Sequence, residues 1–489
     1  MAASSVSVAT FSSRWVMMAA MLGMAVGTGN IWRFPRVAAT NGGGSFLVAW
    51  VVFLLLWSVP LILVEFAMGK QARLGPVGAF SKMVGEKFAW MGAWIAFTAA
   101  AIMFYYAVVT GWTLGFLWGG ITGALPGGEP GEYWEGFVDT PWVLLAQATA
   151  VGLAVLVVAR GVKGIERAAS ILIPSLFALV IILAIRAVTL PGAERGLAFL
   201  FTPDWSELAD YRIWLEALTQ NAWDTGAGWG LIVTYAIYLR RHEDTALNSF
   251  LLGFGNNSMS LLAGIMVLCT VFSIMPNAAD EIVGAGNTGL TFIWVPQLFA
   301  QMPAGRFFMV LFFLALFFAA WTSLISMVEL AVRVLQDRGV ARGRALALVG
   351  GFGFLLGAPS ALSEQIFLNQ DFVWGVALMV SGLFFALAVL KYGVRRFRTT
   401  LINSSDADVR VGLWWEWVIR LVVVQAAVLV AWWFWQVWGE PFWGVFGVGT
   451  LLLQWGIVLA LFLIFNRWIA QGSVSAVPSA SPDALTREP

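Results

Sequence analysis

Apolar residues run in long blocks along almost the whole chain, and short segments that are charged or rich in proline and glycine separate the blocks. A helix needs roughly 20 mostly apolar residues to cross the hydrocarbon core of a bilayer. Twelve blocks have about this length or more: 14–37, 46–69, 90–120, 142–160, 168–189, 213–240, 246–275, 306–335, 343–360, 370–392, 415–438 and 441–467. The pattern therefore predicts an all-α, polytopic membrane protein with about 12 transmembrane helices.

The loops between these blocks differ in charge. The even-numbered blocks are followed by basic residues: Lys70, Arg73, Lys82, Lys87, Arg160, Lys163, Arg167, Arg240, Arg241, Arg338, Arg342, Arg344, Lys391, Arg395, Arg396 and Arg398. The third, fifth and seventh blocks are followed by acidic residues: Glu129, Glu132, Glu135, Asp139, Asp204, Glu207, Asp210, Asp280 and Glu281. Because cytoplasmic loops carry an excess of Lys and Arg, we expect both termini to be cytoplasmic. We also expect a multi-pass protein of the plasma membrane, the inner membrane of a bacterium.

The composition agrees with a chain that lies mostly in lipid. Hydrophobic residues make up 60% of it and charged residues 11%, whereas a soluble domain carries about a quarter charged residues. A net charge of +1 gives no reason to expect nucleic acid as a partner. A single cysteine, Cys269, and a single histidine, His242, supply neither a disulfide nor a convincing metal or nucleophile set, so we expect no enzymatic activity.

Glycine clusters interrupt the first and sixth blocks, as AVGTGN at 25–30 and DTGAGWG at 224–230. Each glycine in a helix costs about 1 kcal/mol relative to alanine, and unwound backbone is tolerated in a membrane only where it is buried or lines a cavity. The interrupted blocks lie five apart. Because five is odd, they would cross the membrane in opposite directions, and the segments at about 14–189 and 213–398 would be inverted copies. Paired interruptions of this kind indicate the binding site of a secondary transporter; close packing of helices is the alternative explanation.

Polar residues at membrane depth indicate where ligands bind. They are Asn30, Tyr106, Gln220, Asn221, Asp224, Asn256, Ser260, Thr322 and Ser323. Their oxygens, with carbonyls freed by unwinding, are hard ligands that suit sodium. Thr322 and Ser323 could instead bond back to their own helix, whereas Asp224, a buried carboxylate, needs a cation, a proton or several donors. We expect Glu65 and Glu329 to stabilise loops or broken-helix backbone.

Several segments carry a resemblance to a known family. They are AVGTGNIWRFPRVAATNGGGSF at 25–46, PLILVEFAMGK at 60–70, YYAVVTGWTLGF at 105–116, residues 217–238, FFAAWTS at 317–323 and the neighbours Asp371 and Phe372. Over roughly residues 11–470 the chain resembles the neurotransmitter:sodium symporter family. The resemblance implies the LeuT fold, a 5+5 inverted repeat followed by two C-terminal helices, and sodium-coupled symport by alternating access.

The spans and the resemblance together divide the chain into four parts. They are a cytoplasmic N-terminal segment at 1–13, a transporter core at 14–398, two further helices at 399–468 and a tail at 469–489. The tail is polar and rich in Ser, Ala and Pro, so we expect it to be disordered. A monomer and a homodimer are both compatible with the sequence.

The resemblance implies two sodium sites. The first would use the Ala25 carbonyl, the Asn30 amide, Asp224, Asn256 and the carboxylate of the substrate. The second would use the carbonyls of Gly23, Val26 and Ala319 with the hydroxyls of Thr322 and Ser323. Asp224 and Ser323 would also border the bound substrate.

The resemblance also implies a substrate site with two gates. The substrate carboxylate would meet Tyr106 and the amides of Thr28 and Gly29, and the amine would meet the carbonyls of Ala25 and Trp223. The substrate side chain would face Met24, Ile102, Trp223, Gly226, Trp229 and Met327. The pair Arg33 and Asp371 would close the outer side beneath an aromatic lid of Tyr106 and Trp229, and Tyr238 and Asp337 match the inner latch.

The chain departs from the family at the inner latch, where the N-terminal Arg-x-x-Trp is absent and the positions read Val8 and Phe11. Arg14 is the candidate substitute for the missing cation. We therefore expect a weaker or differently built inner gate.

A second departure is Asp224, which stands where the family usually has Ser or Thr. Some bacterial members place a glutamate at the position of Ser260, and chloride-dependent members have a tyrosine at the position of Trp50. We therefore hypothesise that Asp224 replaces chloride as the charge that balances sodium, because an unpaired cation is costly in a low-dielectric site. Two sodium ions and no chloride are expected.

Gly27 and Gly226 bear on the substrate. Monoamine carriers of the family have an aspartate at the position of Gly27, whereas amino-acid carriers have glycine, so we expect an amino acid. Gly226, where several members have a bulkier residue, suggests room for a hydrophobic or aromatic side chain. A biogenic or other small amine stays open, since Asp224 could supply the missing negative charge, and so does an amino-acid sensor that does not transport.

Overall fold

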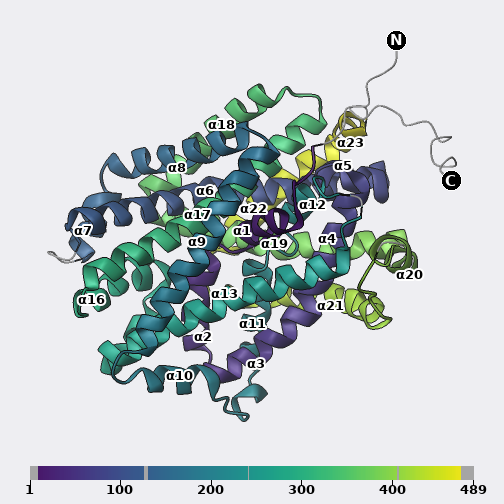
Figure 1. Ribbon diagram of the computed structural model, residues 1–489. Helices are drawn as coiled ribbons and strands as arrows, with labels where there is room; N and C mark the ends of the chain where they lie inside the picture. The colour runs from purple at the N-terminus through teal and green to yellow at the C-terminus, as the bar shows by residue number, and fades with distance from the viewer. Residues whose placement is uncertain (1–8, 126–129, 241, 405–406, 475–489) are drawn as a thin grey trace.

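The structure is a computed structural model that describes residues 9–125, 130–240, 242–404 and 407–474. Within these residues the regular secondary structure is entirely helical. Figure 1 shows the long helices side by side in one bundle, with shorter helices over its ends. The predicted all-α, polytopic architecture is confirmed.

Each of the twelve predicted spans corresponds to one helix or to helices in series. Nine continuous helical spans in the described part of the chain are long and apolar enough to cross a bilayer. They are α3, η2 and α4 (Gly44–Phe53, Leu54–Ser58, Val59–Ala72), η3 with α6 (Glu86–Phe88, Ala89–Thr122), α8 (Trp142–Ala159), α9 (Val162–Val188), α13 (Thr245–Ile274), α17 (Gly305–Asp337), α18 (Arg342–Leu362), α19 (Glu364–Tyr392) and α21 (Trp414–Gln436). The last span, α22 (Val448–Ile464), is shorter.

Short helices connect the spans. They are α5 (Pro76–Met83), α7 (Pro130–Val138), α10 (Ala193–Phe201), η4 (Glu207–Ala209), η5 (Pro276–Ala278), α14 (Ala279–Gly284), α15 (Gly286–Thr288), η6 (Gly289–Trp294), α16 (Val295–Ala300), α20 (Val394–Phe397), η7 (Arg398–Ile402) and α23 (Asn466–Val474).

The first span is broken. Helix α1 (Arg14–Ala25) ends where Val26 turns to an extended conformation, and η1 (Gly29–Arg33) with α2 (Phe34–Thr40) continues at 58° to it. The side chain of Asn30 replaces part of the lost helical bonding, because its Oδ1 accepts from the Gly27 N–H at 2.8 Å. The predicted interruption at 25–30 therefore lies where the helix opens.

The sixth span is broken between α11 (Tyr211–Asp224) and α12 (Leu231–Ala236). Gly226 has φ +72°, a left-handed conformation that a side chain would strain. The fully buried Glu65 of α4 accepts from the Gly228 N–H at 2.6 Å and from the Val233 N–H at 3.4 Å. This confirms that Glu65 stabilises broken-helix backbone.

Long helices enclose the two breaks. Helices α6 and α17 pack along each other, and α13 packs along α9 and against η1. Helix α1 contacts α9, α13 and α17, while α12 contacts α4 and α17. The opened backbone is thus surrounded by protein and kept away from lipid.

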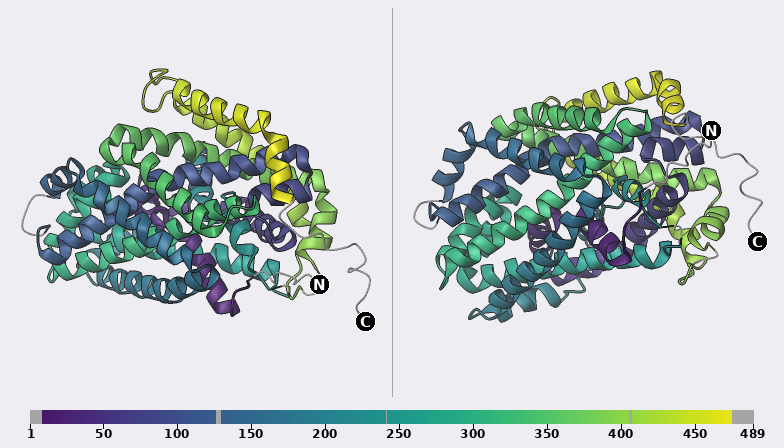
Figure 2. Two further views of the ribbon diagram at one scale, coloured as in Figure 1. Left: turned by 90° about the horizontal axis from the view of Figure 1, so that it is seen from above. Right: turned by 45° about the horizontal axis from the view of Figure 1, so that its top comes forward.

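The C-terminal helices lie on the outside of this core. Figure 2 shows α22, in yellow, along one side of the bundle. Helix α23 then packs on α5 and α6, and Asn466 accepts from the Trp90 N–H at 2.8 Å. The first residues of the tail predicted from 469 belong to α23 as far as Val474, and Ile469 and Ala470 are buried in this contact. Residues 1–8 and 475–489 lie outside the described part.

Replacing Glu65 by alanine tests how much the second break depends on this carboxylate. Leaving buried N–H donors without an acceptor costs roughly 1–3 kcal/mol each, so we expect Glu65→Ala to lower the free energy of unfolding by about 2 kcal/mol or more, and Glu65→Gln to lower it less. Thermal unfolding in detergent measures the effect, with Glu135→Ala, an exposed glutamate of α7, as control. Equal unfolding temperatures for Glu65→Ala and the control would contradict the assignment.

Candidate functional site

A cavity of about 360 Å³ lies between the two breaks. The predicted substrate residues in its wall are Met24, Ala25, Thr28, Gly29, Tyr106, Trp223, Asp224, Gly226, Trp229, Ser323 and Met327. Ile102 does not reach the wall and is fully buried one turn before Tyr106 on α6. The structure thus brings together every predicted substrate residue except Ile102.

Helix α19 supplies a wall that sequence reasoning missed, apart from Asp371. Its wall residues recur every three or four positions, as on one face of a helix: Phe367, Leu368, Asp371, Phe372, Gly375, Val376 and Met379. Helical spacing from Asp371 would have found them. Residues from α21 and the loop after it also line the cavity: Trp433, Val437, Glu440 and Phe446.

Buried polar side chains from three helices meet at Asp224. The Asn30 Nδ2 group donates to Asn256 Oδ1 at 3.0 Å and to Ser260 Oγ at 2.8 Å. Ser260 Oγ in turn donates to Asp224 Oδ2 at 3.1 Å, and Gln220 Nε2 donates to the same oxygen at 3.1 Å. The side chains predicted for the first sodium site are therefore neighbours in one network.

The second carboxylate oxygen of Asp224 has no such partner. Oδ1 is buried and accepts no hydrogen bond from the described residues, and Asp224 is 2% exposed. A buried, unpaired carboxylate oxygen is costly unless a cation, a proton or a donor meets it. Because Asp224, Asn30 and Ala25 all line the cavity, this oxygen set fits a hard cation such as sodium, carried as a co-substrate.

The residues predicted for the second sodium site also lie together. Ser323 Oγ donates across to the Val26 carbonyl at 3.3 Å. Thr322 Oγ1 donates to carbonyls of its own helix, including that of Ala319 at 3.1 Å. A Cβ on Gly23 would lie 3.4 Å from the Thr322 Cβ. Thr322 therefore bonds back to its own helix, whereas Ser323 links α17 to the first break.

Tyr106 lies against the first break. Its hydroxyl oxygen accepts from the Thr28 N–H at 3.0 Å and from Thr28 Oγ1 at 3.2 Å. A Cβ on Gly27 would lie 2.7 Å from the Tyr106 hydroxyl and 2.9 Å from Ser323 Oγ. Any side chain at Gly27 would therefore displace two groups of the predicted site.

The two residues predicted for the outer gate are not paired with each other in the structure. Arg33 and Asp371 both line the cavity, yet the ion pairs found among the described residues do not join them. Arg33 instead donates to Gln220 Oε1. Glu440, also in the wall, is exposed, so the cavity reaches the surface on this side.

Tyr238, predicted for the inner latch, is buried in a network of contacts. Its hydroxyl donates to Glu329 at 2.5 Å, and Glu329 pairs with Arg342 at 2.7 Å. Phe11 is buried, donates its N–H to the Tyr238 carbonyl at 3.0 Å and lies edge-on to the Tyr238 ring. Phe11 therefore supplies an aromatic ring at the position of the tryptophan in the family's Arg-x-x-Trp latch. Val8, at the position of the arginine, lies outside the described residues.

Asp337, also predicted for the inner latch, has partners that the sequence did not predict. It pairs with Arg333 at 2.7 Å and accepts from the Gly75 N–H at 2.6 Å. Arg14 donates to Asn248 at 3.2 Å and does not take the place of the missing cation. Arg333 pairs with Asp337 because it lies one turn earlier on α17, where side chains face each other.

Comparison with known proteins identifies the family. The sequence model of the sodium:neurotransmitter symporter family matches residues 9–141 and 135–466. The chain belongs to this family. It is therefore a sodium-dependent symporter and, with its apolar helices, a multi-pass membrane protein. A transporter family agrees with the expected lack of enzymatic activity.

Individual relatives support the assignment. An uncharacterized sodium-dependent transporter of Bacillus subtilis, YhdH, is 33% identical over 84% of this chain and 94% of its own. One from Methanocaldococcus jannaschii is 30% identical over 86% of this chain and 90% of its own. The crystal structure of MhsT in complex with L-phenylalanine has a TM-score of 0.77 and 31% identity, and covers 87% of this chain and 99% of that one. The family fold expected from sequence is confirmed.

A methyl group at Gly27 tests the geometry of the site. Overpacking of this kind costs about 1–3 kcal/mol, so we expect Gly27→Ala to raise the sodium concentration for half-maximal thermal stabilisation by about tenfold. Gly152→Ala on α8 is the matched control, because a Cβ there meets nothing within 4 Å. If both variants responded to sodium like the wild type, Gly27 would not hold the site as described.

Proposed function

We propose that this symporter couples sodium to the uptake of an amino acid with a large hydrophobic or aromatic side chain, without a requirement for chloride. The observation that carries the proposal is the buried Asp224 carboxylate between the two breaks, with Oδ1 unpartnered among the described residues. A fixed negative charge beside the cavity favours a cation there and offsets its desolvation.

Chloride independence follows from what Asp224 binds. Its Oδ2 already accepts from Gln220 and Ser260, an amide and a hydroxyl that could otherwise donate to an anion. The carboxylate thereby occupies donors that a chloride ion would need. We infer that the negative charge belongs to the chain and does not have to be recruited with each transport cycle.

The first break favours a substrate with a carboxylate. Gly27 leaves no room for the acidic side chain that would pair a bare amine, since a Cβ there meets Tyr106 and Ser323. The proposed carboxylate partners are Tyr106, the amides of Thr28 and Gly29, and the first sodium ion. The proposed amine partners are the carbonyls of Ala25 and Trp223.

The size of the substrate is inferred from the rest of the cavity. The proposed side-chain wall is apolar and aromatic: Met24, Trp223, Gly226, Trp229, Met327 and Met379. Trp223 and Trp229 meet edge to face with ring centroids 5.9 Å apart, an arrangement that aromatic groups prefer. MhsT, to which this chain is similar, was solved with L-phenylalanine.

Two sodium ions are proposed, one at each set of oxygens. The first set is Ala25, Asn30, Asp224 and Asn256, and the second is Gly23, Val26, Ala319, Thr322 and Ser323. The cavity reaches the surface on the side of Glu440, which suits loading of ions and substrate. Closure would bring Arg33 to Asp371 and lower Tyr106 and Trp229 over the substrate. Release would require the Tyr238 and Asp337 networks to separate.

A small amine is the second candidate substrate. Asp224 Oδ1, unpartnered among the described residues, would accept a hydrogen bond from an ammonium group as readily as it would bind sodium. An amine without a carboxylate would leave the Thr28 and Gly29 amides unused.

We place the protein in the plasma membrane of a bacterium with both termini cytoplasmic, as a monomer or a homodimer.

Reconstituted uptake tests the proposed function. In liposomes, an inward sodium gradient should drive accumulation of L-phenylalanine at least about tenfold over a potassium control, and a negative interior should increase the rate because net positive charge enters. A panel of amino acids and biogenic amines as competitors ranks the substrates. Sodium-dependent binding without counterflow would indicate a sensor, and competition only by amines would support the second candidate.

Asp224→Ser tests the source of the negative charge. Removing the carboxylate leaves the sodium site short of one charge, so we expect uptake to fall by at least about tenfold in gluconate and to recover partly in chloride. Wild-type uptake should be equal in the two salts. Asp139→Ser, at an exposed aspartate, is the control. A chloride requirement in the wild type would overturn chloride independence.

A further inference from the structure

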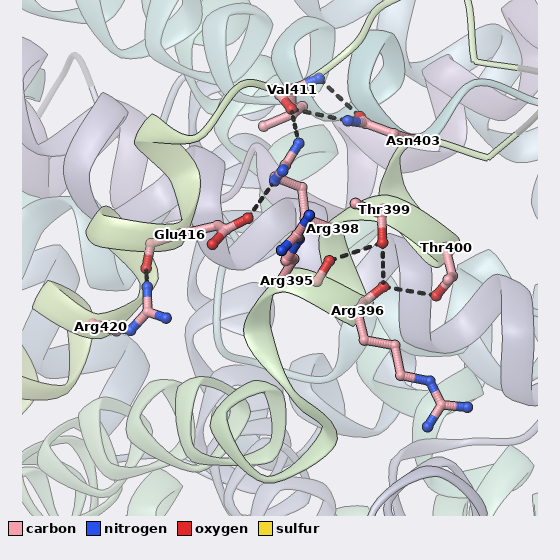
Figure 3. Close-up of polar contacts among 9 residues, drawn as sticks. All are labelled: Arg395, Arg396, Arg398, Thr399, Thr400, Asn403, Val411, Glu416 and Arg420. Carbon is pink, nitrogen blue, oxygen red and sulfur yellow. Dashed lines mark hydrogen bonds and ion pairs between the residues drawn. The ribbon is translucent and has the colours of Figure 1, made fainter.

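The chain makes a rigid corner where α19 passes through α20 and η7 to α21. The rings of Phe397 and Trp415 stack with centroids 5.8 Å apart. Arg398 pairs with Glu416 at 2.7 Å, and Asn403 and Val411 exchange hydrogen bonds at 2.8 and 2.9 Å (Figure 3). These contacts fix the side chains around the corner relative to α21.

Three exposed arginines lie at this corner, and Lys391 at the end of α19 lies over the Phe88 ring. Lys391, Arg395, Arg396 and Arg420 are exposed, and none forms an ion pair with another described residue. Glu416 already forms an ion pair with Arg398. Figure 3 shows Arg396 and Arg420 on opposite sides of that pair.

Arg420 lies on the face of α21 that turns away from the protein. Exposed apolar residues recur on this face every three or four positions, as Trp417, Leu421, Val424 and Val428. Arg420 is about 9 Å along the helix from its start, and its guanidinium donates back to the Glu416 carbonyl. A cation on a lipid-facing surface that reaches toward the helix end is placed at the level of lipid headgroups.

The neighbours of these cations also suit an interface with lipid. Leu413 and Trp417 are 65% and 74% exposed at the start of α21. The Arg420 guanidinium lies 5.6 Å from the Trp417 ring centroid, and that of Arg396 lies 5.1 Å from the Tyr392 ring. A soluble anion would use the cations alone, whereas a lipid would cover the apolar side chains as well.

We propose that this corner binds the headgroup of an anionic phospholipid. Arg420, beside Trp417 on the apolar face of α21, contacts the phosphodiester, because a guanidinium group matches its oxygens in pairs. Arg396, on the other side of the Arg398–Glu416 pair, attracts the same headgroup by its charge. Lys391 and Arg395 add positive charge, and the acyl chains lie along Trp417, Leu421 and Val424. The exposed Asp408 and Arg410 on the preceding loop offset each other in charge.

Native mass spectrometry of the purified full chain tests this site. Equal amounts of phosphatidylglycerol and phosphatidylcholine are added in detergent, and the ratio of the two lipids retained is measured. We expect the wild type to favour phosphatidylglycerol by at least about fivefold, and Arg396→Gln/Arg420→Gln to reduce this preference to less than about twofold. The control Arg195→Gln/Arg212→Gln, at two exposed arginines on α10 and α11, should retain the wild-type preference.

Each outcome decides the proposal. An unchanged preference in Arg396→Gln/Arg420→Gln overturns it, as does an equal loss in the control variant. Displacement of the lipid by millimolar glycerol phosphate would assign the cations to a soluble anion and also overturn it. Should the double variant unfold in detergent, the single variants Arg396→Gln and Arg420→Gln are measured instead, and each is expected to reduce the preference by about half.

Discussion

The structure depends on one constraint, which is that backbone opened inside a membrane must find its partners within the protein. Each break meets the constraint with a buried side chain, Asn30 at the first and Glu65 at the second. These side chains satisfy N–H groups of the breaks, and residues of both breaks line the cavity, among them Ala25 and Gly226. The residues that make the breaks possible therefore also set where a cation and a carboxylate can bind.

The negative charge of Asp224 is also positioned by the second break. Asp224 ends α11 at the second break, and Gln220 lies one turn earlier on that helix. Gln220 donates to Asp224 and accepts from Arg33, so it joins the carboxylate to the outer gate. A cation that changes the charge around Asp224 would thus act on the hydrogen bond between Arg33 and Gln220. This link offers a physical route from ion binding to closure.

Much of this could be predicted because glycines and polar residues stand out in apolar blocks. The spans, both breaks and the Asn30, Asp224 and Asn256 cluster were all visible in this way. The α19 wall was not, because apolar residues that face protein and lipid look alike in a membrane helix. The pairing of Asp337 with Arg333 and the packing of α23 on α5 depend on tertiary contacts that no local pattern specifies.

Binding of radioactive sodium to the purified protein in a chloride-free buffer tests the central claim most directly. The account predicts saturable binding by the wild type without chloride or substrate, and at least about tenfold weaker binding by Asp224→Asn, because the neutral amide keeps the shape of the side chain and removes its charge. Sodium binding that requires chloride, or that is equal in the two proteins, would contradict it.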